Sequence, residues 1–292
     1  PVAMNRKSGP ADYLKALLKL NLPKDILPAP PSPKERSTGE LMGEAGEKMG
    51  QRNNINRADQ DTFAVQSHLR AAAAIESGRF ADEICAMEAP NGKLISADDN
   101  VRGDANVEKM AKLRPAFSRN GTLTAGNSST LTDGAGAVLL MSEEKARALG
   151  YDKLVAFRSW SYDAVDPADQ MLLGPAISMP RAAAKAGLKR KDLDFIDIHE
   201  AFAAQVLVIL KMLASEAFAQ QRLGYDKAFG LVAPEEINVH GGSIALGHPF
   251  AATGARMVTT MANELKLSGK STALLGICGG GGNSAGAVLE QV

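Results

Sequence analysis

The sequence has 292 residues, and 45% of them are hydrophobic, which is enough apolar material for a large core in one or two domains. Lys and Arg together number 33, as do Asp and Glu, so the charge balance gives no indication of nucleic-acid binding. Two cysteines, Cys85 and Cys278, are too few for a disulfide framework and favour a reducing compartment. No apolar run approaches the length of a membrane-spanning helix.

The first 35 residues are predicted to be an insertion. Leucines at helical spacing over residues 11–20, with Lys15 and Lys19 on another face, predict a basic amphipathic helix. The proline-rich stretch 23–33 that follows is incompatible with a helix or a central strand. Two hypotheses remain open for this segment: peripheral contact with a membrane, or packing over an active site.

Two helices are predicted next. The sequence Ser37-Thr-Gly-Glu40 is a capping box and predicts a helix directly after it, with Leu41, Ala45 and Met49 on one face. Asn56 is predicted to cap a longer helix that runs to Ile75.

From residue 120 onward, apolar runs typical of strands alternate with helical patterns. The predicted strands are Ala135–Met141, Lys153–Ser159, Phe195–Ile198, Ile237–His240, Ser271–Cys278 and Ala285–Gln291. The predicted helices are Ser142–Leu149, Pro180–Ala186, Ala201–Ala217 and Thr253–Leu265. This alternation predicts an α/β fold in which helices are layered on sheets.

A sequence repeat links two parts of this region. Residues 132–139 and 282–289 share Ala-Gly-Ala-Val-Leu at a spacing of 150 residues, and in this register Cys278 lies opposite Ser128. A duplicated α/β half explains the repeat. The second half would be complete, whereas the first would contribute only its end, so we expect the chain to be N-terminally truncated.

Three segments place a reactive side chain directly after a predicted strand, where open α/β folds place their sites. His199 and Glu200 follow the strand 195–198, although both could simply cap the next helix. His248 lies in a glycine-rich loop with Gly247 and Pro249, where backbone can approach a ligand closely.

In the third segment, Cys278 ends a predicted strand and is followed by four glycines, whose backbone N–H groups could bind an oxyanion. A free cysteine has a pKa of about 8.5, so such a side chain could both give and take a proton. The alternative is a buried small apolar side chain in a tight turn. His240 is interpreted as structural.

Taken together, the boxes His199-Glu-Ala-Phe202, Gly247-His-Pro249 and Cys278-Gly-Gly-Gly-Gly282 resemble the thiolase family in type and order. The resemblance covers the whole chain, because Thr124–Ser129 with Asp133-Gly-Ala looks like the family's CoA-side loop. The common family box begins with Asn, and His199 in its place is similar to the β-subunit thiolases of fatty-acid oxidation complexes. The resemblance therefore implies a duplicated, layered α/β fold with a largely helical loop domain.

The resemblance also implies roles for individual residues. His248 would activate the nucleophile and help to hold the thioester oxygen, and His199 would support an oxyanion site through a water. Cys278 would protonate the leaving enolate and later deprotonate CoA. Among the implied substrate-binding residues, Ser129 would contact the pantetheine arm, Gly280 would donate its N–H to an oxyanion, and Gly247 would shape the loop of His248. CoA and acyl-CoA would be substrates, with no permanent cofactor and no metal.

The nucleophilic cysteine of the family belongs to its first half, upstream of residue 1 in this register. Cys85 has no glycine turn or helix start beside it, so it is not expected to be that nucleophile. The implied activity is thiolytic cleavage of 3-ketoacyl-CoA in fatty-acid β-oxidation, with this chain alone inactive. The alternatives are a non-catalytic acyl-CoA or lipid-binding protein, a chain complemented by a partner, and a biosynthetic acetoacetyl-CoA thiolase.

Three further expectations follow from the resemblance. Residues 1–119 would form the loop domain, 120–150 the end of the N-terminal half, and 151–292 the C-terminal half. The protein would be a homodimer, with a hydratase–dehydrogenase subunit as a possible partner and no nucleic acid. It would be mitochondrial in a eukaryote and cytoplasmic in a bacterium.

Overall fold

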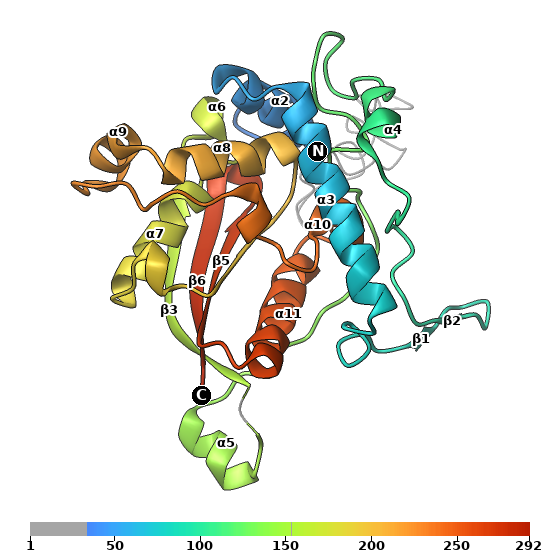
Figure 1. Cartoon of the computed structure of the whole chain (residues 1–292), viewed down its shortest axis with the longest axis vertical. Helices are drawn as coiled ribbons and strands as arrows, with labels where there is room; N and C mark the ends of the chain where they lie inside the picture. The colour runs from blue at the N-terminus through green and yellow to red at the C-terminus, as the bar shows by residue number, and fades with distance from the viewer. Residues whose placement is uncertain (1–33, 153) are drawn as a thin grey trace, which may run out of the picture. The chain divides into compact units, whose positions relative to one another are not determined.

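The computed structural model describes residues 34–152 and 154–292, and Glu35–Val292 form one compact unit (Figure 1). The helix expected at 11–20 and the proline-rich segment 23–33 lie outside the described residues, as does almost all of the segment for which membrane contact was considered. In the described part, no single helix is long and apolar enough to cross a membrane. The bent helix pair Ala203–Leu213 and Glu216–Leu223 has the length and the apolar composition that a membrane span needs, and these two properties are the only ones that indicate it.

A four-stranded sheet forms the centre of the second half. Its order is β3 (Val155–Ala164), β6 (Asn283–Gln291), β5 (Thr272–Cys278) and β4 (Phe195–Ile198). The first two neighbouring pairs are antiparallel, and β5 and β4 are parallel. All four strands were predicted, although β3 continues five residues beyond Ser159. The strand predicted at 237–240 does not form. Ile237 makes one parallel bridge to Ile196, and the chain then turns because Asn238 adopts φ 52°.

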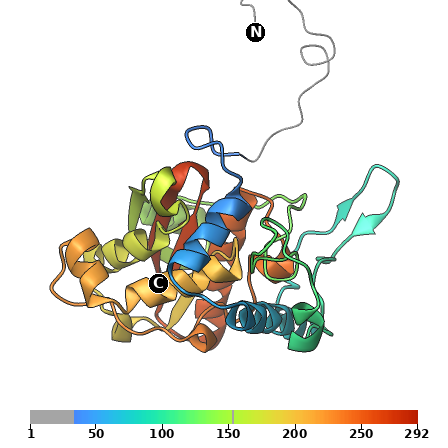
Figure 2. The ribbon, with the colours of Figure 1, turned by 90° about the horizontal axis from the view of Figure 1, so that it is seen from above.

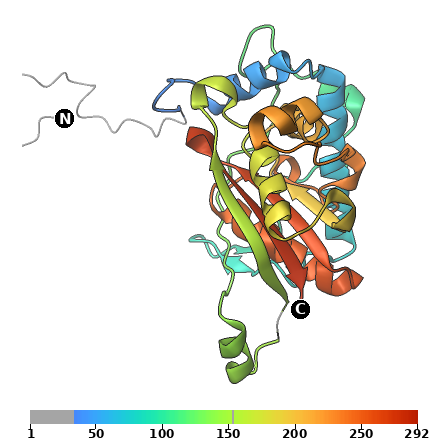
Figure 3. The same ribbon diagram turned by 90° about the vertical axis from the view of Figure 1, so that its left-hand side faces the viewer.

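Helices cover both faces of this sheet, which confirms the predicted layering (Figures 1 and 3). Side chains alternate along β5, so Leu274 and Cys278 join the core beneath α7 (Pro175–Lys185) and α8 (Ala203–Leu213). Leu275 on the opposite face packs with Leu265 of α11 (Ala252–Ser268). Each fully buried leucine of this kind stabilises the fold by about 1.5–3 kcal/mol.

The described region before residue 120 combines helices with long irregular segments, so the largely helical loop domain expected there is wrong in that detail. It contains α2 (Met42–Arg52), α3 (Arg57–Glu76), α4 (Val107–Ala111) and a short hairpin of β1 (Met87–Glu88) and β2 (Leu94–Ile95), which projects from the rest of the unit in Figure 2. The predicted cap of α3 is confirmed, since the Asn56 side chain accepts the N–H of Asp59 at 2.8 Å. The capping box at 37–40 is wrong: α2 begins after Leu41, whose N–H donates to the Glu44 carboxylate at 2.8 Å.

Other predicted elements differ from the structure. Helix α5 (Glu143–Leu149) is capped by Ser142, the first residue of the predicted helix, and α7 begins five residues earlier than predicted. The helix predicted over 201–217 is broken after Leu213, and α9 (Glu216–Phe218) restarts behind the cap of Ser215. The remaining short elements are α6 (Pro167–Gln170), α10 (Ser243–Leu246) and the turns Arg190–Asp192, Ala219–Leu223, Pro234–Glu236 and Gly280–Gly282.

The strand predicted at Ala135–Met141 is wrong. The segment pairs with no strand among the described residues, and Leu139 and Leu140 are 71% and 67% exposed. A strand requires partners for its backbone groups, and the sequence pattern alone does not supply them.

Candidate active site

The parallel pair β4 and β5 carries two of the predicted site residues to one edge of the sheet. Ile198 at the end of β4 is in register with Gly276 of β5, and the N–H of His199 donates to the Gly276 carbonyl at 2.8 Å. Cys278 follows at the end of β5. The carboxyl ends of parallel strands therefore bring His199 and Cys278 to the same edge of the sheet.

The segment 128–131 connects this edge to the loop of His248. Ser129 donates its N–H to the Ala201 carbonyl at 2.9 Å, and His248 donates its N–H to the Thr130 carbonyl at 2.9 Å. Leu131 also forms a parallel bridge with His248. Three predicted residues from distant parts of the sequence, Ser129, His199 and His248, thus lie on adjoining backbone.

The two histidines stack on each other. The ring centroids of His199 and His248 are 4.2 Å apart with an interplanar angle of 39°. Each ring is held through Nδ1, which lies 2.8 Å from Ser243 Oγ in His199 and 2.7 Å from Thr253 Oγ1 in His248. No side chain in the described part of the protein hydrogen-bonds to Nε2 of either ring, so both nitrogens remain for a substrate.

Both imidazoles are held neutral. Burial lowers the pKa of His199 well below its usual value, and the charge of Arg256, together with that of His248 whenever the latter is protonated, acts in the same direction. Burial also lowers the pKa of His248, again with Arg256 as the second cause. A neutral imidazole has one donor and one acceptor nitrogen, so each ring can either stabilise an oxyanion or accept a proton.

Glu200 does not cap the helix that follows it in the sequence, contrary to the alternative considered above. Its carboxylate is fully buried and accepts hydrogen bonds from Ser67 Oγ at 2.7 Å, Asn238 Nδ2 at 2.6 Å and the N–H of Ile244 at 3.1 Å. Burial raises its pKa, and these donors oppose the rise. The carboxylate ties α3 and α10 to the loop of His199. The start of α8 is capped instead by Gln205, whose Oε1 accepts the N–H of Ala201 at 3.0 Å.

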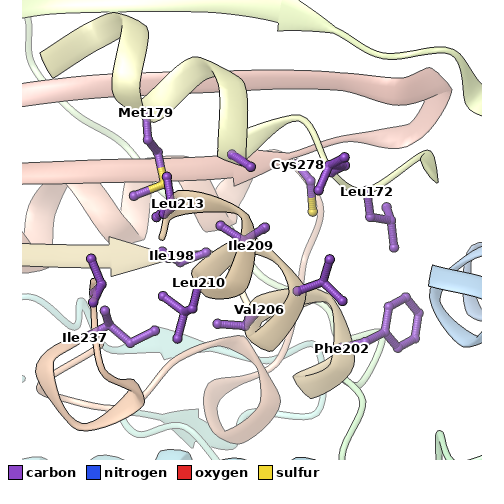
Figure 4. Close-up of a cluster of buried hydrophobic side chains, with 14 of the residues drawn as sticks. Leu172, Met179, Ile198, Phe202, Val206, Ile209, Leu210, Leu213, Ile237 and Cys278 are labelled. Atoms are coloured by element: carbon purple, nitrogen blue, oxygen red, sulfur yellow. The ribbon is translucent and has the colours of Figure 1, made fainter. Parts of the chain in front are cut away.

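Cys278 is 5% exposed, and Figure 4 shows its side chain extending from β5 into the apolar cluster that includes Leu172 and Ile209. Burial raises the pKa of its thiol to about 12. The expectation of a pKa near that of free cysteine is therefore wrong, because an apolar environment disfavours the thiolate. The group is a thiol at neutral pH.

Glycines shape the backbone on both sides of the site. Gly247 has φ 92°, and a Cβ there would lie 2.5 Å from the Thr132 side chain, so the turn before His248 requires glycine. Gly280 is exposed, and a Cβ there would meet nothing within 4 Å. Open space therefore lies beside the Gly280 backbone, as a role for its N–H requires.

A pocket of about 240 Å³ adjoins the site. Its wall includes Arg102, Lys109, Ala125, Gly126, Thr130 and Ile244. Thr130 and Ile244 also hydrogen-bond to His248 and Glu200 through their backbones, which connects the pocket directly to the site. A larger, open hollow of about 580 Å³ lies near Tyr162 and Arg181 and includes none of the site residues.

The remaining cysteine and histidines have other settings. Cys85 is exposed in the segment that precedes β1, away from any helix start. His240 lies 2.6 Å from Glu264 and packs edge-on against Phe80. Within residues 34–152 and 154–292, no three His, Cys, Asp or Glu side chains converge as a metal site would require.

Sequence reasoning missed the polar residues that support the site. Ser243, Thr253 and Arg256 contact the histidines or each other, and Ser67 and Asn238 hold Glu200. No spacing rule identifies these residues, because they approach the site from different elements. Only the short distance of Thr253 from His248 along the chain could have indicated a contact.

Comparisons with known proteins agree with this architecture. The chain matches the thiolase N-terminal domain over residues 24–144 and the thiolase C-terminal domain over residues 151–291. It is 45% identical over 291 residues to a 3-ketoacyl-CoA thiolase of Shewanella woodyi, and 49% identical over 291 residues to one of Pectobacterium carotovorum. Each alignment covers 99% of this chain and 66% of the relative.

Solved structures show the same fold. A Bacillus anthracis acetyl-CoA acetyltransferase matches 89% of this chain and 62% of its own with a TM-score of 0.79 at 35% identity. Human mitochondrial 3-ketoacyl-CoA thiolase matches 89% of this chain and 61% of its own with a TM-score of 0.78 at 31% identity.

The chain therefore belongs to the thiolase family, and its α/β fold is that of a thiolase. It spans about two thirds of the length of the curated relatives that it matches. Those relatives are bacterial, so the mitochondrial branch of the expected localisation is not supported.

Proposed function

We propose that this chain provides the acid–base and oxyanion-binding machinery of a 3-ketoacyl-CoA thiolase, an acyltransferase that cleaves 3-ketoacyl-CoA with CoA. The observation that carries the proposal is the His199–His248 stack, in which both rings keep Nε2 available at the sheet edge that Cys278 also reaches. Cys85 is exposed and Cys278 is held as a buried thiol, so the nucleophilic cysteine is proposed to come from outside these 292 residues.

The proposed cycle begins when His248 Nε2 takes the proton of the nucleophilic thiol. The resulting thiolate attacks the 3-keto carbon, and the oxygen that becomes negative is held by the Nε2–H of His199. When the bond between the α and β carbons breaks, its electron pair moves into an enolate of acetyl-CoA. Fixed donors at such charges contribute about 10²–10³ in rate each, and the Gly280 N–H is assigned to the enolate oxygen.

Cys278 completes the proton balance. Its thiol gives a proton to the α carbon of the enolate, and acetyl-CoA leaves. The Cys278 thiolate then takes the proton of the incoming CoA thiol, whose sulfur attacks the acyl carbon. The bond from that carbon to the nucleophilic sulfur breaks, and this sulfur recovers its proton from His248 Nε2. The pKa of about 12 supports both steps, because the thiol is protonated beforehand and its thiolate is a strong base afterwards.

The pocket of about 240 Å³ is the proposed path of CoA toward the site. Arg102 and Lys109 in its wall suit the phosphates of CoA. Ser129 lies beside the loop of His199, where it would contact the pantetheine arm. One solved relative, the human mitochondrial thiolase, is described as a complex with CoA. No permanent cofactor is included in the proposal.

A degradative thiolase is favoured over a biosynthetic acetoacetyl-CoA thiolase. Two relatives described as 3-ketoacyl-CoA thiolases are 45% and 49% identical to the chain. We further propose that the protein is a homodimer in the bacterial cytoplasm and that it associates with a hydratase–dehydrogenase subunit. Residues 1–119 are proposed to form the loop domain. The end of the N-terminal half would then span 120–150, and the C-terminal half 151–292.

The test is an assay of thiolysis by the whole protein with 3-ketoacyl-CoA substrates of several chain lengths. The loss of substrate and the appearance of acetyl-CoA are measured. The His248→Ala variant should lose about 10²–10⁴ in kcat, because a general base is removed. CoA binding without any thiolysis by the unaltered protein would instead support a non-catalytic acyl-CoA-binding protein. A preference for acetoacetyl-CoA would favour the biosynthetic alternative.

A further inference from the structure

Ser243 joins His199 to Arg256. Its Oγ lies 2.8 Å from His199 Nδ1, and an Nη2 of Arg256 donates to the same Oγ at 3.2 Å. Ser243 is completely buried at the start of α10. The three side chains come from the loop after β4, from α10 and from α11, so only the folded chain brings them together.

The guanidinium of Arg256 is anchored on its other side. Its Nη1 lies 3.9 Å from Asp197 Oδ2, on the buried strand β4. Burial raises the pKa of Asp197 to about 6, and the charge of Arg256 opposes that rise. At neutral pH the pair keeps the guanidinium directed toward Ser243.

The chemistry of these groups fixes the direction of each hydrogen bond. A guanidinium has donors only, so Ser243 Oγ must accept from Arg256. The single hydroxyl proton of Ser243 is then left for His199 Nδ1. If Nδ1 itself carried a proton, two donors would face one oxygen and the buried Ser243 proton would lack an acceptor, which is unfavourable. His199 Nδ1 therefore accepts, and its ring proton is on Nε2.

We propose that Ser243 and Arg256 are positioning residues that hold His199 in the Nε2–H tautomer, so that Nε2 can donate to the substrate oxygen. The identity of that oxygen rests on the proposed function, whereas the tautomer does not. Within residues 34–152 and 154–292, neighbouring His248 has only Thr253 Oγ1 at its Nδ1, and a threonine hydroxyl can donate or accept there. The two stacked imidazoles would thus have different tasks because different residues hold them.

The test is a two-bond ¹H–¹⁵N correlation spectrum of the protein labelled with ¹⁵N-histidine, which distinguishes the two neutral tautomers. The sequence has only four histidines, and the His199→Gln variant assigns the relevant signal. In the unaltered protein, the Nε2–H tautomer of His199 should exceed the other by about tenfold or more. Ser243→Ala and Arg256→Met should each reduce that ratio by at least about threefold, since each removes part of the bias.

Two matched variants serve as controls. Ser178→Ala removes another completely buried serine hydroxyl, and Arg190→Met removes an arginine that pairs with Glu236 and is 22% exposed, close to the 24% of Arg256. Both controls should keep the tautomer of His199. If Ser243→Ala does not fold, Arg256→Met alone tests the proposal. This variant is expected to fold, because the side chain of Arg256 is partly exposed.

A proton on His199 Nδ1 in the unaltered protein would overturn the proposal, as would a ratio that neither Ser243→Ala nor Arg256→Met changes. The spectrum requires no turnover. A failure of thiolysis with the expected tautomer would therefore count against the proposed function alone, and an unexpected tautomer in an active enzyme would count against the positioning role alone.

Discussion

The two copies of Ala-Gly-Ala-Val-Leu have the same sequence and different structures. Residues 285–289 lie within β6, where Val288 and Leu289 are completely buried. Residues 135–139 form no strand, and the corresponding Val138 and Leu139 are 39% and 71% exposed. Identical local preferences therefore gave a core strand in one place and an extended, unpaired segment in the other.

The difference lies in what surrounds each copy. Strand β6 pairs with β3 on one side and β5 on the other, so its backbone groups are satisfied. Its two faces are covered separately, because Val288 packs in the core beneath α7 and α8 and Leu289 packs with Leu265 of α11. The first copy crosses the start of α11 instead, where a Cβ on Gly136 would be 2.8 Å from the Cβ of Ala255. Partner strands, rather than intrinsic preference, decide whether such a sequence becomes a strand.

The largest expected effect concerns the cysteine that precedes the second copy. Cys278→Ala should lower the kcat of thiolysis by about 10²–10⁴ in the whole protein, because the proposed proton donor to the enolate is lost. Ser128→Ala is the matched change before the first copy, and its buried hydroxyl has no hydrogen-bond partner in the described structure, so kcat should be unchanged. Steady-state kinetics would contradict the assignment if Cys278→Ala retained near-normal turnover.

Leucine truncation tests the comparison directly. Leu289→Ala should lower the free energy of unfolding by about 2–5 kcal/mol, because a completely buried side chain leaves a cavity. Leu139→Ala should change it by no more than about 0.5 kcal/mol, as expected of an exposed position. Urea denaturation of the two variants measures the difference. Equal losses would mean that the first copy is packed as well as the second.

The pH dependence of the free energy of unfolding tests whether α3, which precedes the first copy, is closely packed around His68. His68 is 3% exposed, and burial followed by the charge of Arg102 lowers its pKa from 6.5 to about 4. Between those pH values the unfolded chain binds more protons than the folded one, so the free energy of unfolding falls as the pH falls from 6.5 toward 4 and is fully retained above 6.5. The contribution of His68 to that loss is about 3 kcal/mol.

The His68→Asn variant isolates this contribution, since the asparagine oxygen can still accept the N–H of Arg102 as Nδ1 does at 3.2 Å. Urea denaturation at several pH values should give a shallower pH dependence for the variant than for the unaltered protein. Parallel curves would indicate that His68 is solvated.

The smallest expected effect concerns helix caps on the two sides of the first copy. Asn56→Ala should destabilise the protein by about 1 kcal/mol, because α3 packs in the core and loses the acceptor for the Asp59 N–H. Ser142→Ala removes the corresponding cap of α5, where Ala146 is the buried residue of the helix, and should cost less. Thermal denaturation measures the loss of stability in both variants. A larger loss for Ser142→Ala than for Asn56→Ala would contradict this prediction.

The sequence determined which residues are proposed to carry chemistry. His199, His248 and Cys278 each lie at the end of a predicted strand or in a glycine turn, where open α/β folds place their sites, whereas the parallel pairing that brings His199 and Cys278 to one edge was not predicted. The cap of α3 and the four strands of the sheet were also readable, because caps and alternating apolar runs are local signals.

Only the tertiary structure decided how those residues are held. The pKa of Cys278 depends on apolar side chains from other elements, and the proposed tautomer of His199 depends on Ser243 and Arg256, more than 40 residues away along the chain. The fate of 135–139 depended on strand partners that no local pattern encodes. Propensity and spacing act over a few residues, whereas burial, charge and hydrogen-bond direction are properties of the space that the whole chain encloses.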